Sequence, residues 1–265
     1  MKASRVSEWV DDRQRGGRYA FTLPDLAKSI PGSRPSLRQS LLRLQQKNRV
    51  RRLRGEFFVI LPVEYARIGM IPADWFIEDL MVYLGQSFHV GLFSAAALHG
   101  AGHQQVQTYQ VMTAQKERSI ETAGLKLDFF QKKHLAETPL VKVKGHAGML
   151  PVSSPAATAL DLVAWANRLG GLDAIVTPLE ELCELMTPDD LASTAQALHN
   201  HSIVQRTGWL LDRLGQADLA DSLAAAQADH LFSASRVPLD PGAERQGASD
   251  NRWRIIVNAQ PEGDL

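Results

Sequence analysis

The 265-residue sequence contains a single cysteine, Cys183. One cysteine excludes an intramolecular disulfide and any metal cluster that is built from several thiolates. It also favours a reducing compartment, and we therefore expect a cytoplasmic protein. Long apolar runs are missing as well: the longest candidate, Val90 to Leu98, has about half of the roughly 20 residues that a membrane-spanning helix needs. The charged first twenty residues do not fit a secretory signal.

The sequence also lacks net charge, because 29 Lys and Arg residues balance 29 Asp and Glu residues. The two signs are unevenly distributed along the chain. Residues 1–60 carry 14 basic and 5 acidic side chains, whereas residues 61–265 carry 15 basic and 24 acidic ones. A basic segment favours polyanionic partners, and an acidic remainder limits non-specific adhesion to them. We therefore predict two domains with different partners, residues 1–62 and residues 63–265.

Acidic side chains are absent from the stretch between Arg34 and Arg54, where eight basic residues gather. These are Arg34, Arg38, Arg43, Lys47, Arg49, Arg51, Arg52 and Arg54. Such a run is often the solvated face of an ordinary helical subdomain, and it can also serve protein docking. The pattern around it favours a third explanation, DNA binding.

Three helices are predicted in the first 50 residues. The first extends from about Ser4 to Arg15. Thr22 and Asp25 have the spacing of a capping box at the start of the second helix, and Ser33 can cap the third. The third helix carries an apolar stripe at the spacing of one buried face, formed by Leu37, Leu41 and Leu44.

A hairpin is predicted directly after these helices, because VRRL and EFFVIL flank the turn dipeptide Arg54-Gly55. Three helices followed by a hairpin are typical of a winged helix-turn-helix, whose third helix enters the DNA major groove and whose wing touches the backbone. Basic side chains there neutralise phosphates or read base edges, and short Ser and Gln side chains allow close approach. The predicted DNA contacts are Arg34, Ser36, Arg38, Gln39, Arg43, Lys47, Arg49, Arg51, Arg52 and Arg54.

The larger C-terminal part is predicted to combine a small mixed sheet with a helical bundle. Strands are expected at residues 108–114, 125–130, 139–145, 149–153 and 252–258, and helices at residues 73–85, 92–99, 155–167, 172–186, 188–199, 203–214 and 217–229. Ser202 and Gln205 fit a capping box at the start of the helix at 203–214. The fold class is therefore α+β, with an N-terminal winged helix-turn-helix before a mixed α/β domain.

Two groups of residues in this part have spacings that are found in metal sites. His99 and His103 are four residues apart, but the glycines between them and the missing glutamate favour a helix end over a zinc site. Asp128, Gln131 and Lys133 resemble the acidic and Q-x-K elements of metal-dependent nucleases. Their compressed spacing favours a solvated strand end.

Other reactive side chains fit structural roles. Cys183 has no neighbouring histidine or aspartate that would support a nucleophile, and a core position is expected for it. Arg206 lies at core spacing on its helix, with Asp161 as one partner that it could reach. His199 and His201 lie at a helix end, where solvation is expected. No phosphate-binding glycine loop occurs, and we predict no enzyme, no metal and no cofactor.

Five stretches occur in an order and spacing that are characteristic of one family. They are LRQSLLRLQQKNRVRRLRGEFFVILP, VGLFSAAALHGAGHQ, VSSPAATALDLV, IVQRTGWLLDRLG and RWRIIVN. On these stretches the chain resembles the AbiEi-type antitoxins of type IV toxin–antitoxin and abortive-infection systems. The tail from Ser233 to Leu265 is longer than this pattern suggests, and it could be an ordered arm or a loose end.

The resemblance implies two roles. The N-terminal winged helix-turn-helix would bind inverted repeats in its own promoter and repress the operon. The C-terminal domain would counteract a co-encoded toxin resembling a nucleotidyltransferase, without a stable complex. Inverted repeats require two DNA-binding domains per operator, and since no coiled coil is visible we expect a monomer in solution that binds DNA cooperatively.

Two other functions stay open on the sequence alone. One is a ligand-responsive transcriptional regulator without antitoxin activity. The other is a DNA-targeted, metal-dependent nuclease that uses Asp128 and Lys133. The sequence does not give the operator or the mechanism of toxin neutralisation.

Overall fold

The computed structural model describes residues 5–102, 107–198 and 200–262. The chain divides into two compact units, each of which is described by itself. The first unit comprises residues 1–88, 107–132 and 142–150, and the second comprises residues 89–106, 133–141 and 151–265. Residues 63–88 therefore belong to the same compact unit as residues 1–62. The functional boundary after residue 62 stays a prediction.

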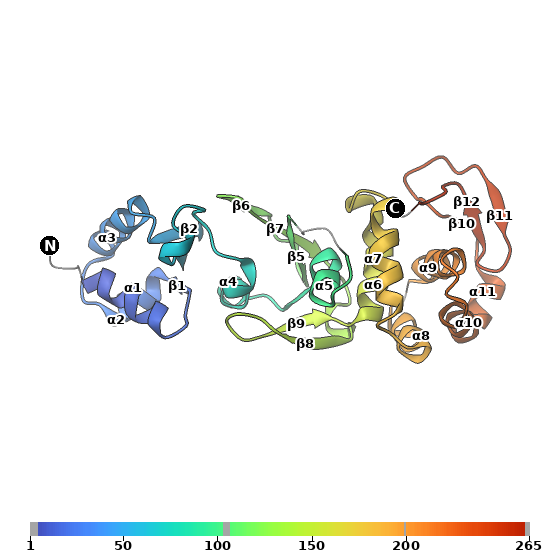
Figure 1. Cartoon of the computed structure of the whole chain (residues 1–265), viewed down its shortest axis with the longest axis horizontal. Coiled ribbons are helices and arrows are strands. Elements are labelled where there is room, and N and C mark those ends of the chain that lie inside the picture. Colours follow the sequence, from blue (N-terminus) through green and yellow to red (C-terminus); the bar gives the residue numbers. More distant parts are fainter. Residues whose placement is uncertain (1–4, 103–106, 199, 263–265) are drawn as a thin grey trace. The chain divides into compact units, whose positions relative to one another are not determined.

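Three helices and three strands open the first unit (Figure 1). They are α1 (Arg5–Arg15), β1 (Ala20–Thr22), α2 (Leu23–Ser29), α3 (Arg34–Gln46), β2 (Val50–Arg54) and β3 (Phe57–Ile60). The strands form an antiparallel sheet in the order β1-β3-β2. The three predicted helices and the hairpin β2–β3 are confirmed, while Ser4, the predicted start of the first helix, lies outside the described residues. The sequence missed β1, because three residues are too few to show the alternation of a strand. The arrangement is compatible with a winged helix.

Local hydrogen bonds fix where α2 and α3 begin. The Thr22 hydroxyl accepts from the Asp25 N–H at 3.2 Å, and Asp25 Oδ2 accepts from the Thr22 N–H at 2.9 Å. This is the predicted capping box. Ser33 Oγ accepts from the Ser36 N–H at 3.4 Å and caps α3 as predicted. The tight turn between β2 and β3 is possible because Gly55 adopts a left-handed conformation, with φ +53°.

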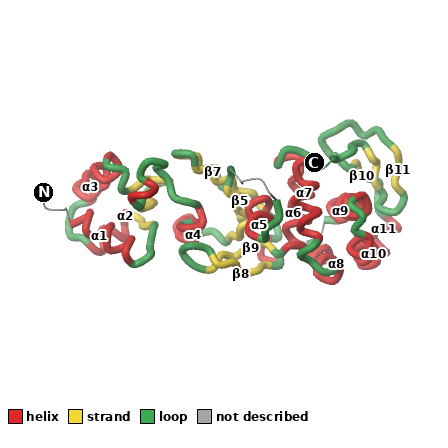
Figure 2. The backbone as a smooth tube through the Cα atoms, in the orientation of Figure 1, coloured by secondary structure: helices red, strands yellow, loops and turns green. Residues whose placement is uncertain are grey.

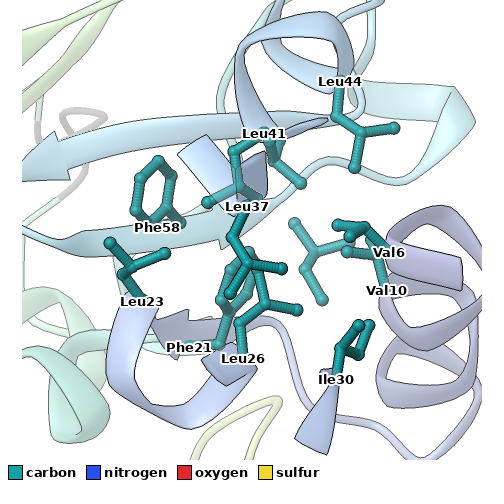
Figure 3. Close-up of a cluster of buried hydrophobic side chains, with 12 residues drawn as sticks. Val6, Val10, Phe21, Leu23, Leu26, Ile30, Leu37, Leu41, Leu44 and Phe58 are labelled. Atoms are coloured by element: carbon teal, nitrogen blue, oxygen red, sulfur yellow. The ribbon is translucent and has the colours of Figure 1, made fainter. Parts of the chain in front are cut away.

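The apolar faces of these elements meet in one core, which Figure 3 shows in close-up. Its buried side chains come from all three helices and all three strands. They are Val6, Val10, Phe21, Leu23, Leu26, Ile30, Leu37, Leu41, Leu44, Val50, Phe58 and Ile60. The predicted leucine stripe of α3 is thus buried, and α3 turns its remaining faces outward.

The rest of the first unit includes α4 (Ile77–Leu84), β5 (Tyr109–Thr113), β6 (Ile120–Thr122) and β7 (Leu125–Gln131). β5 and β7 are parallel, and β6 is antiparallel to β7. Short 3₁₀ helices at Val63–Tyr65 and Ala73–Trp75 precede α4. β5, β7 and α4 lie where the sequence predicts them, whereas the three-residue β6 was missed.

The second unit is mainly helical (Figure 2). Its helices are α5 (Leu92–Leu98), α6 (Pro155–Trp165), α7 (Asp173–Cys183), α8 (Pro188–Ala197), α9 (His201–Arg213), α10 (Ala217–Ala226) and α11 (Ala228–Ser233), with short 3₁₀ helices at Leu135–Glu137 and Ala166–Arg168. Three further strands have residues in both units: β4 (Phe88–Val90), β8 (Leu140–Lys144) and β9 (Met149–Ser153). β4 and β9 pair in parallel through Val90 and Val152. The predicted helices are confirmed with small changes of their ends.

The predicted cap of α9 is wrong. α9 begins at His201, and Asn200 Oδ1 accepts from the Ile203 N–H at 3.4 Å. Asparagine caps a helix as well as serine does and comes first in the chain, so Ser202 lies inside the helix. Gln205, the expected second member of the box, is buried. Its side-chain amide donates instead to the carbonyl oxygens of Ser235, Trp253 and Arg254 at 3.1, 3.1 and 3.3 Å.

The tail after Ser233 is an ordered arm as far as the described residues extend. It forms a small sheet in the order β10-β12-β11, from β10 (Val237–Pro238), β11 (Ala248–Asp250) and β12 (Ile255–Val257). Trp253 has no exposed surface, and its Nε1 donates to Asp212 Oδ2 on α9 at 2.6 Å. A Cβ atom at Gly208 would overlap the Trp253 ring, so α9 requires glycine at this close approach. Two of the stretches that carry the family resemblance thus pack on each other.

Candidate nucleic-acid interface

The ten predicted DNA-contacting residues lie on α3, at its C-terminal end and on β2, all within the first unit. The structure keeps them in one continuous region. It divides them into three groups, however, because several of the side chains already have partners. The division depends on the face of α3 that each residue occupies and on acidic residues that lie outside the basic stretch.

The first group consists of Arg34 and Arg38, which share one acidic partner. Glu56, in the turn between β2 and β3, accepts from Arg34 Nη2 at 3.1 Å and from Arg38 Nη2 at 2.8 Å. The side chains of the two arginines are 58% and 60% exposed, and that of Glu56 is 28% exposed. The sequence signal is present but easy to miss, because Glu56 follows the basic stretch by only two residues.

The second group consists of Arg49, Arg51 and Arg54. Their side chains contact other residues of the first unit. Arg49 forms an ion pair with Asp11 of α1. Arg54 forms an ion pair with Glu117 and donates to the Arg118 carbonyl.

Arg51 is half-buried. A Cβ atom at Gly69 would lie 2.8 Å from Arg51 Nη2, so the guanidinium lies close over this glycine. Burial and ion pairing leave this second group less available to DNA than the sequence predicts.

The third group, which we call the outward set, is exposed and consists of Ser36, Gln39, Arg43, Lys47 and Arg52. Within the described part of the chain, Arg43 and Lys47 have no acidic partner. Arg52 Nε donates to the Gly55 carbonyl and so remains at the hairpin turn. Three cations on α3 and β2 can therefore meet phosphates, while Ser36 and Gln39 offer short polar groups beside them.

Sequence reasoning missed one further residue on this surface, Leu42. It is 47% exposed although it follows the buried Leu41 directly. Its place outside the leucine stripe was a usable signal, because a helical residue one position after a buried one turns away by about 100°. An exposed leucine on such a helix can make apolar contact with a thymine methyl group.

The candidate metal residues have ordinary structural surroundings. His99 Nε2 donates to the Ser153 carbonyl at 2.7 Å, and His103 lies outside the described residues. Asp128 Oδ2 is 3.9 Å from Lys126 Nζ, and Gln131 donates to the Ala114 carbonyl at 3.4 Å. Among the residues that the structure describes, no three His, Cys, Asp or Glu side chains are grouped so that they could hold a metal ion.

The other chemically reactive candidates lie in the second unit. Asp161 is buried, and Arg206 is partly buried as expected, with its Nε donating to the Pro238 carbonyl at 3.0 Å. Burial lowers the pKa of Arg206. His201 stacks on His230, while His199 lies outside the described residues. No helix in the described part of the chain combines the length and apolar character that crossing a bilayer requires.

Cys183 is buried, and its thiol donates to the Leu179 carbonyl at 3.1 Å. Burial raises the pKa of this thiol to about 12. A raised pKa keeps the thiol protonated near neutral pH, and the thiolate is the reactive form.

We therefore expect native protein at pH 8 to react with a thiol reagent such as DTNB far more slowly than urea-unfolded protein. Equal rates in the two states would contradict the buried position.

The region that begins at β4 has a known counterpart. The family model described as the AbiEi antitoxin C-terminal domain matches residues 89–213. Residues 89–213 therefore belong to the AbiEi antitoxin C-terminal domain family. The match extends from β4 through α9, and the N-terminal helices, the hairpin β2–β3 and the C-terminal sheet lie outside it.

Structural similarity extends over more of the chain than the sequence match does. The crystal structure of the RV2827C protein from Mycobacterium tuberculosis is similar with a TM-score of 0.68 and 14% sequence identity, covering 96% of this chain and 92% of that chain. At this identity the likeness shows a shared fold alone. No curated protein matches the sequence.

Proposed function

We propose that this AbiEi-family protein is a DNA-binding antitoxin that represses its own operon. In this proposal residues 1–62 form a winged helix-turn-helix that binds inverted repeats in the promoter. Residues 63–265 counteract a co-encoded toxin that resembles a nucleotidyltransferase. The observation that carries DNA binding is the outward set, above all Arg43 on α3 and Lys47 at its C-cap, which have no acidic partner among the residues that the structure describes. The AbiEi domain at residues 89–213 supports the antitoxin role.

DNA recognition by this surface has an electrostatic part and a base-reading part. Arg43, Lys47 and Arg52 attract the duplex and neutralise phosphates, which releases bound counterions and makes the affinity depend on salt. Gln39 and Ser36 are exposed on the same helix and would hydrogen-bond base edges in the major groove. Phosphate contacts then set the position on the duplex, and base contacts select the sequence.

The remaining parts of the proposal concern assembly and location. The protein is cytoplasmic, monomeric in solution and cooperative on DNA, where two copies occupy the two halves of an inverted repeat. It neutralises the toxin without a stable complex and without a metal, a cofactor or a catalytic step. The support for these points is the family resemblance and the single buried cysteine.

One bacterial strain tests both roles at once. It carries the upstream region fused to a reporter gene, together with the co-encoded toxin under an inducible promoter. Wild-type protein should repress the reporter and restore growth, whereas Arg43→Ala/Lys47→Ala should lose repression and still restore growth. Point variants are preferred to deletion of residues 1–62, because residues 63–88 share their compact unit.

The alternative functions give different results in the same strain. Repression by wild-type protein without any rescue of growth would identify a plain transcriptional regulator. An unaffected reporter would contradict autorepression. Plasmid cleavage that requires a divalent metal and is lost in Asp128→Ala would revive the nuclease hypothesis.

A further inference from the structure

Glu56 joins the hairpin to α3 through a shared carboxylate. Each carboxylate oxygen takes one arginine, with Oε2 at 3.1 Å from Arg34 Nη2 and Oε1 at 2.8 Å from Arg38 Nη2. The two arginines are four residues apart and therefore lie on the same side of α3. The result is a pair of guanidinium groups that hold one anion between them.

The position of Glu56 is fixed by its backbone. Its N–H donates to the Tyr83 hydroxyl at 3.1 Å. The centroid of the neighbouring Phe57 ring is 5.5 Å from that of the Tyr83 ring. A Cβ atom at Gly55 would overlap the Tyr83 hydroxyl, so only glycine allows the turn to come this close. The backbone of Glu56 therefore has a defined place, from which its carboxylate reaches Arg34 and Arg38.

The chemistry of this arrangement is that of a phosphate site. Arginine binds carboxylate and phosphate oxygens with the same planar set of donors. Both arginines are more than half exposed, so their remaining donors face solvent. Ion pairs this exposed are weak, which means that a backbone phosphate with a full negative charge can compete with the carboxylate.

We propose that Glu56 occupies, in the free protein, the place of a DNA phosphate between Arg34 and Arg38, and thereby limits the affinity for DNA. The inference rests on the DNA-binding function proposed above. On binding, a phosphate replaces the carboxylate, and the displaced negative charge stays close to the DNA backbone and opposes the complex. Because phosphate contacts carry no sequence information, the limit applies to every duplex.

The test is Glu56→Gln in the full-length chain, measured as binding of a labelled upstream duplex and of a scrambled duplex. Affinity should increase by about 3- to 10-fold for both duplexes. The dependence of log K on log salt should also become steeper, by about 1 unit, because the bound protein then carries one negative charge fewer beside the DNA backbone.

Two controls separate the proposed contact from a general charge effect. Glu64→Gln makes the same charge change at an exposed residue of the same unit and should alter affinity by less than about 2-fold. In an Arg34→Gln/Arg38→Gln background, the gain from Glu56→Gln should disappear. Circular dichroism and the thermal unfolding midpoint show whether each variant is folded. Glu56→Ala is a second variant that removes the carboxylate and keeps the backbone hydrogen bond to Tyr83, and it should show the same gain in affinity.

The outcomes are distinguishable. Wild-type binding with no gain in Glu56→Gln, or a gain no larger than that of Glu64→Gln, overturns the inference and leaves DNA binding intact. Weaker binding by Glu56→Gln also overturns it, because it would mean that the carboxylate holds the arginines in a productive position. Absence of binding by wild type and every variant would overturn both the proposed function and the inference.

Discussion

Alanine at both Arg43 and Lys47 should weaken binding of the upstream duplex by about 10- to 100-fold. Both side chains are exposed, Arg43 on α3 and Lys47 at its C-cap, and among the described residues neither has an acidic partner. Their charges are therefore fully available to phosphates, unlike those of Arg49 and Arg54. Loss of two phosphate contacts should also flatten the plot of log K against log salt by about 2 units. Fluorescence anisotropy at several salt concentrations measures both quantities.

A matched control makes the same charge change far along the chain. Arg213 and Lys133 are exposed residues of the second unit, and Arg213→Ala/Lys133→Ala should leave the affinity within about 2-fold of wild type. Equal losses in the two double variants would mean that only net charge matters. Unchanged affinity and slope in Arg43→Ala/Lys47→Ala would exclude the outward side of α3 as the DNA-binding surface.

Trp253→Ala should lower the free energy of unfolding by about 3–5 kcal/mol, the usual cost of truncating a large aromatic side chain in a core. The Trp253 ring is completely buried against Gly208, and its Nε1 donates to Asp212. Truncation leaves a cavity at α9 and removes the partly buried hydrogen bond to Asp212. Urea denaturation followed by circular dichroism measures the change in stability.

Arg252 provides the control, because it is the neighbouring residue and is exposed. Its guanidinium pairs with Asp212 and Asp221, at 2.9 and 2.5 Å, and 40% of its side chain is exposed. Exposed pairs of this kind contribute about 0–1 kcal/mol, so Arg252→Ala should cost far less than Trp253→Ala. No effect of Trp253→Ala would contradict a stabilising role of the C-terminal arm, and equal losses in the two variants would contradict the special contribution of the buried Trp253 ring.

Local signals predicted much of the fold. The capping box of Thr22 and Asp25, the cap at Ser33 and the leucine stripe of α3 all involve residues within one or two helical turns, so sequence spacing was sufficient. The short strands β1, β6, β10 and β11 were missed. A strand of two or three residues shows no alternation, and only its partner elsewhere in the chain stabilises it.

The candidate site was predicted as a region but not in its internal division. The basic stretch ends at Arg54, whereas the acidic partners Asp11, Glu56 and Glu117 all lie outside it. A count of charges along the chain therefore treats all eight cations as equivalent. Only the long-range packing shows that some are neutralised and that Arg43 and Lys47 are not. The contact of Gly208 with Trp253 could not be predicted for the same reason, because the two residues are 45 positions apart in the sequence.

The most direct test of the account is a titration of two labelled duplexes with wild-type, full-length protein at two salt concentrations. One duplex carries the sequence upstream of the gene, and the other is a scrambled version of the same composition. The account predicts tight binding to the upstream duplex alone, which weakens as salt rises. Equal, weak binding to both duplexes would contradict it, because the basic surface of α3 and β2 would then not read DNA sequence.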